Sequence, residues 1–487
     1  MRTRPGIVLG CALAWLAGAA SAQDRPAAAG ADEQARALLG ELVAIRSAKG
    51  HGQVPAVAAL LAERFRQAGF ADEDIRVLES RTDDGEPLAA LIVRYRTDAA
   101  NPAPPIAVLG HMDVVDADPA RWDTDPFVLT ARDGWWQGRG SADNKGPIAA
   151  IASTLIQLKR SGWMPQRDLL LVLSGDEESG SRTTVALTRD PWLQEVEFAI
   201  NGDTGGGQVD ANGGHPVFDL QVAEKTSVSF KLSSRNRGGH SSEPRADNAL
   251  YEIADAIKAV QALRFPVRID EANRAMVQGL ARDRDSELGQ AFSALLADTT
   301  DAAARAVVER YPQDAHVLWT TCVPTLVSGG SARNALPQGA ELIVHCRIFP
   351  GQSIESVQAA LVQAVANPAV RVEVDAARGS SPPSPVREDV MAAAGRAFAS
   401  LYPGAEVRAS MSSGGSDGRY FRQAGIPTYG VNPMAVTRPD DDRAHGIDER
   451  LRIESFDKAL PFWDAFLREL AALPAGQTPH SPRTPQP

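Results

Sequence analysis

The sequence predicts an α/β protein, with a mixed-sheet domain into which a smaller α+β domain is inserted. Three apolar, strand-like runs, at residues 106–110, 168–174 and 198–200, each lead into polar residues that include acids and glycines. Helical periodicity separates these runs, as in sheets whose functional site lies beyond the strand ends. Between about residues 218 and 378 the order becomes strand, helix, strand, strand, helix, strand, which indicates the inserted domain.

The chain begins like an export signal. Positive charges precede an apolar run at 7–19 that is short for a bilayer span, and residues 20–22 form a small-residue cleavage site. We expect residues 1–22 to be removed and the mature protein to be secreted, into the periplasm if the source is a Gram-negative bacterium, without stable membrane insertion. A lipoprotein signal at Cys11 is a weaker alternative, because the apolar run continues beyond that cysteine.

Composition limits the class of partner. The formal net charge of −11 argues against binding to nucleic acid, which needs a basic face. Beyond the leader two cysteines remain, Cys322 and Cys346, too few for a disulfide framework or a four-cysteine zinc site. Whether these two cysteines pair or stay as separate buried thiols is left open by the sequence.

The first part of the larger domain is predicted to span residues 23–217. Apolar residues at helical spacing predict helices at 31–45 and 54–68, and short apolar runs predict strands at 75–78 and 89–95. These elements precede the strands that carry the polar residues.

Two polar residues, His111 and Asp113, end the strand that begins at residue 106. Residues two apart in an extended chain point to the same side, so Asp113 can orient the imidazole of His111. The glycine-rich loop that follows presents Asp143 just before a helix expected to start at Pro147, a favoured first helical position.

An apolar strand also leads into three consecutive acids, Asp176, Glu177 and Glu178. Adjacent carboxylates repel one another, and a strand end beside apolar neighbours solvates them poorly. A bound cation would relieve both costs. Asp203 follows the next strand in the same way.

The inserted domain is predicted to span residues 218–378. Its expected elements are a strand pair at 218–222 and 227–232, a helix at 248–263, strands at 316–328 and 341–349, a helix at 354–365 and a strand at 370–375. Residues 264–315 look mostly helical, and the sequence assigns them no role.

The larger domain then resumes over residues 379–475. We expect a helix at 388–400, a glycine-rich loop at 412–421, a strand at 426–430 and a last helix at 453–471. Residues 476–487, which are rich in proline, are predicted to be a disordered tail.

Three of the eight histidines, His111, His240 and His445, lie in polar, glycine-flanked contexts that suit a ligand, and the others are expected at the surface or in packing. The candidate metal ligands are His111, Asp143, Glu178, Asp203 and His445. Two imidazoles and three carboxylates exceed one tetrahedral zinc site with an open position, and they suit two metals bridged by a carboxylate. Nitrogen and oxygen ligands favour Zn²⁺, two per protomer, with Co²⁺ or Mn²⁺ able to substitute.

In this order the motifs resemble a known family, the zinc aminoacylases, acetylornithine deacetylases and carboxypeptidases, and most closely its carboxypeptidase S-like branch. The resemblance covers nearly the whole mature chain. It rests on His111-Met-Asp113, Gly140-Ser-Ala-Asp143, Gly175-Asp-Glu177-Glu178, Asn201-Gly-Asp203, Gly238-Gly-His240 and His445-Gly-Ile-Asp-Glu449. It implies a catalytic domain of the co-catalytic zinc exopeptidase type with an inserted lid and dimerisation domain.

The resemblance also implies roles for single residues. Asp143 would bridge the metals, with His111 and Asp203 on one and Glu178 and His445 on the other. Glu177 would act as general base and then as general acid, and Asp113 would orient His111. In a homodimer formed through the lid, His240 would reach the active site of the other protomer.

The substrate carboxylate would be held by Asn334, Arg347 and Gly415, again by resemblance. His345 stands where many relatives have Asp, two residues before the arginine, which puts the local support of Arg347 in doubt. The implied function is hydrolysis of an amide beside a free carboxylate, through a metal-bridging water, as in a carboxypeptidase or dipeptidase acting on small peptides. The alternative is an N-acyl-amino-acid amidohydrolase, and a catalytically dead binding protein is less favoured because neither a ligand nor the base is missing.

Overall fold

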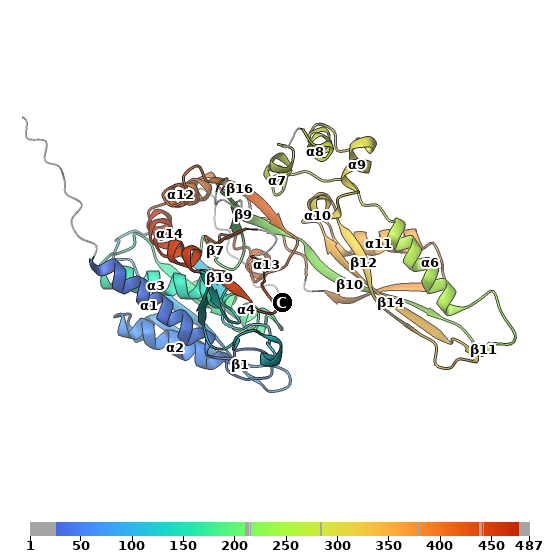
Figure 1. Ribbon diagram of the computed structural model, residues 1–487, viewed down its shortest axis with the longest axis horizontal. Coiled ribbons are helices and arrows are strands. Elements are labelled where there is room, and N and C mark those ends of the chain that lie inside the picture. Colours follow the sequence, from blue (N-terminus) through green and yellow to red (C-terminus); the bar gives the residue numbers. More distant parts are fainter. Residues whose placement is uncertain are drawn as a thin grey trace, which may run out of the picture.

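The computed structural model describes residues 26–209, 214, 216–282, 285–377, 379–437, 441 and 443–476. The predicted leader and residues 477–487 of the predicted tail lie outside the described residues. Figure 1 shows an α/β domain with a narrower domain extending to one side, and both α/β character and the separate antiparallel sheet confirm the predicted fold class. In the described part of the chain, no helix has the length and apolarity needed to cross a bilayer.

A ten-stranded mixed sheet forms the centre of the larger domain. Its order is β1 (Ile75–Arg81), β2 (Pro87–Tyr95), β6 (Leu169–Ser174), β3 (Ile106–His111), β7 (Phe198–Asn201), β17 (Thr428–Gly430), β9 (Val217–Glu224), β8 (Gly206–Gln208) and β18 (Ala435–Val436), with β16 (Glu406–Ser412) pairing β9. The middle strand β3 runs parallel to both β6 and β7. The carboxyl ends of these three strands therefore meet at one edge.

Helices cover both faces of this sheet, because its strands carry apolar side chains on both sides. The larger core packs β3 residues such as Val108 against α1 (Pro26–Val43), α2 (Val54–Gln67), α3 (Lys145–Arg160), α12 (Glu388–Ala399) and α14 (Ile453–Ala471). The opposite face packs Leu109 against α4 (Arg182–Leu187), α5 (Pro191–Gln194) and α13 (Gly418–Gln423). Burial on both faces explains why the strands read as unbroken apolar runs.

Short elements complete the larger domain. They are the three-stranded sheet of β19 (Arg450–Arg452), β5 (Trp135–Gln137) and β4 (Thr130–Arg132), and the 3₁₀ turns η1 (Asp72–Asp74) and η2 (Pro119–Arg121). The β19 strand leads directly into α14 and follows the loop that carries His445.

The lid is a four-stranded antiparallel sheet with its own core. Its order is β12 (Thr321–Gly329), β14 (Gly339–Ile348), β10 (Thr226–Arg235) and β15 (Val370–Ala377), packed by α6 (Ala249–Ala262) and α11 (Ile354–Val365). A small two-stranded sheet, β11 (Gly239–His240) with β13 (Ala335–Leu336), lies at the end of the lid away from the catalytic domain (Figure 1).

One expectation for the lid was wrong. The strand that starts near residue 218 does not pair with the strand at 227–232, because β9 pairs in parallel with β16 in the central sheet. Five consecutive β9 residues, from Leu220 to Glu224, are buried, which is typical of an interior strand and not of a lid strand with one exposed face. The chain crosses from one sheet to the other at Lys225.

The helical segment between the lid helix α6 and β12 bridges the two domains. It contains α7 (Arg274–Leu280), α8 (Glu287–Ala297), α9 (Ala302–Val308), α10 (Pro312–Ala315) and η3 (His316–Leu318). Its apolar residues, such as Val277 and Phe292, join the core of the larger domain, with α7 beside β16 (Figure 1). The Lys225 ammonium donates to the carbonyls of His316 (2.5 Å) and Trp319 (2.6 Å), so the segment is also tied to the crossing point.

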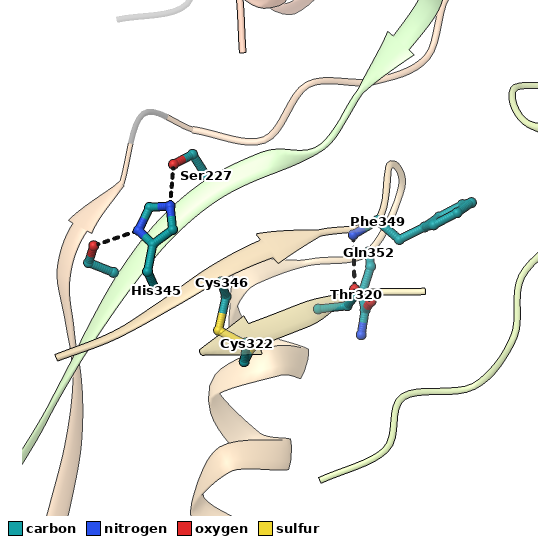
Figure 2. Close-up of a disulfide and its surroundings, with 8 residues drawn as sticks. Ser227, Thr320, Cys322, His345, Cys346, Phe349 and Gln352 are labelled. Carbon is teal, nitrogen blue, oxygen red and sulfur yellow. Dashed lines mark hydrogen bonds between the residues drawn. A yellow bond between two sulfur atoms is a disulfide. The ribbon is translucent and has the colours of Figure 1, made fainter. Parts of the chain in front are cut away.

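A disulfide between Cys322 and Cys346 answers the question that the sequence left open. The two cysteines face each other on β12 and β14, with a Cα–Cα distance of 4.1 Å (Figure 2). The bond joins the edge strand of the lid to the strand that carries His345 and Arg347.

Candidate metal centre

The site forms where three parallel strands end. His111 is the last residue of β3, Glu177 and Glu178 lie in the turn after β6, and Asp203 follows β7. Because these strands are neighbours in one sheet, their ends deliver the side chains to one place. The sequence pattern predicted this juxtaposition correctly.

The five predicted metal ligands lie together. The Nε2 atom of His111 is 3.0 Å from Asp143 Oδ1 and 3.4 Å from Asp203 Oδ1. The Nε2 atom of His445 is 3.0 Å from Asp143 Oδ2 and 2.8 Å from Glu178 Oε1. Asp143 thus presents one carboxylate oxygen to each histidine, which is the arrangement that a bridging ligand needs.

The carboxylates of this cluster favour positive charge beside them. Burial lowers the pKa of the His111 imidazole. The surrounding carboxylates, Asp203 first, together raise this pKa by more than burial lowers it, so the net shift is upward. Hydrogen bonds that the His445 ring donates to the carboxylates of Asp143 and Glu178 raise the pKa of His445 to about 10. The donor set of the cluster, two imidazoles and three carboxylates, is one that Zn²⁺ prefers. Donor atoms of His111, Asp143 and Glu178 lie within 4.8 Å of one another, so the residues fit a metal group.

Asp113 positions the turn that carries the two glutamates. Its carboxylate oxygens accept the backbone N–H groups of Glu177 (3.0 Å) and Glu178 (3.1 Å). The Nδ1 atom of His111 is 3.0 Å from the Asp113 backbone carbonyl and 3.4 Å from its carboxylate. The predicted contact between Asp113 and His111 is present. The hydrogen bonds of the Asp113 carboxylate, however, go to the backbone of this turn.

The chain at Glu177 and Glu178 is not part of the strand. The β6 strand ends at Ser174, and residues 177–180 form a turn. Burial first, and then the charges of Asp417 and other carboxylates, raise the pKa of Glu177 well above its ordinary value, against the opposing effect of His111. A raised carboxyl pKa suits a group that takes and returns a proton near neutral pH.

One cavity joins the cluster to the lid. It has a volume of about 550 Å³ and is lined by all five predicted metal ligands together with residues of the lid. Its lining residues are His111, Asp143, Glu177, Glu178, Asp203, Ser227, Ser229, His345, Arg347, Ala376, Ala377, Gly414, Gly415, Arg419 and His445. Arg347 and Gly415, both predicted to hold substrate, therefore face the same space as Glu177.

A model for the family described as "Peptidase family M20/M25/M40" matches residues 107–469. The chain belongs to this family. M20 membership makes it a metallohydrolase of amide or peptide bonds and implies a dinuclear metal site, in agreement with the cluster.

Known relatives of this M20 chain include several kinds of hydrolase. It is 26% identical over 367 residues to the N-fatty-acyl-amino acid synthase/hydrolase PM20D1 of Homo sapiens, covering 74% of this chain and 72% of the relative. It is 25% identical over 372 residues to the probable carboxypeptidase S-like 2 of Dictyostelium discoideum, covering 74% and 70%. Its fold matches the M20 family metallo-carboxypeptidase Sso-CP2 of Sulfolobus solfataricus with a TM-score of 0.68 at 19% identity, covering 90% of this chain and all of that one.

Two predicted residues of the M20 site do not reach it within this chain. His240 pairs with Ala335 at the far end of the lid, and the backbone N–H of Ser241 donates to the Asn334 carbonyl (Figure 1). His240 and Asn334 therefore lie together, and neither lines the cavity. Their predicted roles stay predictions.

His345 was expected at the surface or in packing, but it lines the cavity. Its ring nitrogens are 3.3 Å from Ser227 Oγ and 3.1 Å from Ser229 Oγ (Figure 2). Burial, and then the charge of Arg347, lower the pKa of His345, which favours the neutral imidazole beside the arginine. The two hydroxyl groups thus fix the orientation of the His345 ring.

Sequence reasoning missed residues that support the ligands. The amide of Asn144 donates to Asp203 Oδ1 (3.1 Å), and its oxygen accepts the backbone N–H of His111 (3.2 Å). The buried Glu449 carboxylate accepts the N–H groups of Gly140, Ala142 and Asp143, and it pairs with Arg139 at 2.6 Å. Asn144 directly follows one of the motifs quoted above and Glu449 ends another. That position was the signal that could have identified them as supporting residues.

Proposed function

We propose that this M20 chain is a secreted, zinc-dependent exopeptidase that hydrolyses the amide bond next to a free carboxylate in small peptides. The observation that carries the proposal is one cavity that holds the histidine–carboxylate cluster, a half-buried Glu177 and Arg347 together. The cluster would hold two zinc ions through His111, Asp143, Glu178, Asp203 and His445. Glu177 is not among these ligands, so its carboxylate is available to accept and donate a proton.

Two zinc ions in this cluster supply a Lewis acid for the scissile carbonyl and a water that deprotonates near neutral pH. Glu177 accepts the proton of the attacking water, since its raised pKa and its place in the cavity suit a general base. The same carboxyl then gives the proton to the departing amine. The Asp113 carboxylate keeps Glu177 in position through the backbone of the turn.

Arg347 supports the choice of an exopeptidase. A guanidinium can bind a carboxylate through two parallel hydrogen bonds, and one at the rim of the cavity would select substrates with a free carboxylate near the scissile bond. Gly415 lines the same cavity and leaves its backbone accessible to that carboxylate.

A homodimer through the lid would complete the site. The edge strand β12 exposes Val323 (54%), Leu326 (68%) and Val327 (62%), apolar residues that an edge strand of a monomer would normally avoid. His240 and Asn334, at the tip of the lid, would then reach the cavity of the partner. His240 would stabilise the oxyanion there.

Secretion rests on the predicted leader and agrees with the cross-strand disulfide, because such bonds persist in oxidising compartments.

The second candidate function is hydrolysis of N-acyl amino acids, because the relative PM20D1 is named as an N-fatty-acyl-amino acid synthase/hydrolase. Both substrate classes present an amide beside a carboxylate, so the cavity accommodates either chemistry.

The test uses purified, zinc-loaded protein with a panel of dipeptides and N-acyl amino acids. We expect chelator-sensitive hydrolysis and two zinc ions per protomer by elemental analysis. We expect Glu177→Gln to keep the metal and to lose at least about 100-fold in kcat. Hydrolysis that survives both chelation and Glu177→Gln would overturn the proposal, and the ranking of the two panels decides between peptidase and N-acyl hydrolase.

A further inference from the structure

A second arginine, Arg419, lines the cavity of the metal cluster. It lies in α13, only 4% of its surface is exposed, and it shares the cavity with Glu177 and Arg347. Its Nη1 atom lies 2.6 Å from the point where a side chain on Gly415 would place its Cβ. A side chain at position 415 would force this guanidinium to shift from its present place.

Arg419 differs from the other buried arginines in the described part of the chain. Arg139 pairs with Glu449, Arg167 with Glu197 and Arg422 with Glu224, each at 3.0 Å or less. Arg419 has no such carboxylate partner among the described residues, and its Nε and Nη2 atoms are buried without a hydrogen-bond partner.

The acid closest to Arg419 in sequence is already occupied. The carboxylate of Asp417 accepts hydrogen bonds from the hydroxyl groups of Ser174 and Thr184. A buried guanidinium without an anion is costly, and its planar fork of donors matches a carboxylate. A ligand that carries an anion would offset this cost of burying the guanidinium.

The rest of the cavity wall agrees with an anionic, polar ligand. Its apolar side chains are only those of Ala376 and Ala377, so the residues that line this cavity offer little surface to a large apolar group. Two guanidinium groups, Arg347 and Arg419, stand in the same cavity beside a cluster that takes cations.

We infer that Arg419 forms a second anion subsite and that the enzyme prefers substrates carrying two carboxylates, one for Arg347 and one for Arg419. This inference rests on the proposed function. The second carboxylate can belong to an acidic side chain on the leaving amino acid or to a dicarboxylic acyl group. Both sources present the same chemistry to the guanidinium.

Matched substrates distinguish the two sources. The zinc-loaded full-length protein is assayed with N-acetylglutamate against N-acetylglutamine, and with N-succinylalanine against N-succinamoylalanine. We expect kcat/KM for the acidic member of at least one pair to exceed that of its amide isostere by about 10- to 100-fold, the range of one charge-assisted contact. We expect Arg419→Gln to reduce that ratio below about threefold by raising KM for the acidic member.

Arg408→Gln is the matched control, because Arg408 lies on β16, outside the cavity lining, and pairs with Asp219 at 2.6 Å. This variant should keep the preference of the wild type. The inference is overturned if neither pair is discriminated, or if the discrimination survives in Arg419→Gln.

A readout without turnover separates this inference from the proposed function. Succinate should raise the Tm of wild-type protein more than butyrate does, and Arg419→Met should abolish that difference. Without ligand, Arg419→Met should have a Tm equal to or above that of the wild type, since it removes a buried, unpaired charge. A lower Tm, or an unchanged succinate effect, would show that Arg419 serves the fold instead. Succinate binding that needs Arg419 in a protein that hydrolyses no amide would defeat the proposed function alone.

Discussion

The carboxylate of Asp113 accepts the backbone N–H of Glu177 at 3.0 Å, although the two residues are 64 positions apart in the sequence. The same carboxylate accepts the N–H of Glu178 at 3.1 Å. One buried acid thus positions both the candidate base and a candidate metal ligand, without touching the cavity itself.

Asp113→Asn should therefore lower activity through position. An amide has one acceptor oxygen and would turn its NH₂ group toward one of the two N–H donors. We expect a fall of about 10- to 100-fold in kcat, typical of residues that support metal ligands. Steady-state kinetics with elemental analysis measure it. Asp116→Asn is the control, because Asp116 is exposed and bonds Arg46, and unchanged kcat in Asp113→Asn would refute the positioning role.

Glu449→Ala should destabilise the fold and weaken metal binding together. The variant removes the acceptor for three backbone N–H groups and leaves the buried Arg139 unpaired. We expect a loss of about 3–5 kcal/mol in the free energy of unfolding, the cost of breaking a buried ion pair. Denaturant unfolding and zinc titration measure both effects.

A matched comparison for Glu449→Ala is Glu454→Ala in α14. Glu454 pairs with Lys458 at the surface, with its side chain 77% exposed. Its removal should cost no more than about 1 kcal/mol. Equal losses in the two variants would contradict the assignment of Glu449 as the anchor of the Asp143 loop.

Removing the disulfide should destabilise the protein. Cys322 and Cys346 enclose a loop of 24 residues, so the double variant Cys322→Ala, Cys346→Ala should lose about 2–4 kcal/mol. Urea unfolding measures the loss, and a reductant should affect the wild type but not the double variant. Two free thiols in unreduced, denatured wild type would contradict the bond.

Stability should depend on pH through Asp417. Burial, more than the opposing hydroxyl hydrogen bonds, raises the pKa of this carboxyl to about 7 from 3.8. A raised acid pKa gives stability that is full below pH 3.8 and is lost as the pH rises through 7. The free energy of unfolding of Asp417→Asn should therefore gain on that of the wild type between about pH 4 and 7, by a few kcal/mol, and then stay level.

This pH dependence is measured by denaturant unfolding of metal-free protein at several pH values. Asp389→Asn serves as the comparison, because pairing with Arg387 lowers the pKa of Asp389. That variant should lose stability relative to the wild type as the pH rises through the acid range. A flat difference for Asp417→Asn would show that its carboxyl is ionised throughout.

The place of His240 predicts complementation between protomers. His240 lies at the tip of the lid and does not line the cavity of its own chain. We expect His240→Ala and Glu177→Ala to be inactive alone and to recover part of the activity when mixed and re-associated. Sedimentation confirms that mixed dimers form, and absence of recovery in them would refute the trans arrangement.

The sequence by itself determined the fold class and the five candidate metal ligands that the structure brings together. Apolar strands that lead into His111, Glu178 and Asp203 can be read locally, because strand burial and a polar strand end are properties of short segments. The motifs around Asp143 and His445 added the remaining ligands. None of these inferences required knowing which distant segments touch.

Only the tertiary structure decided the features that depend on contacts between distant segments. Local alternation did not reveal that β9 pairs with β16, nor that Glu177 lies in a turn held by Asp113. The pairing of Cys322 with Cys346 depends on strand register, and that Arg419 has no carboxylate partner among the described residues depends on every group around it. The periodicity of apolar residues predicts whether a residue is buried. Which residues it contacts depends on how the whole chain packs.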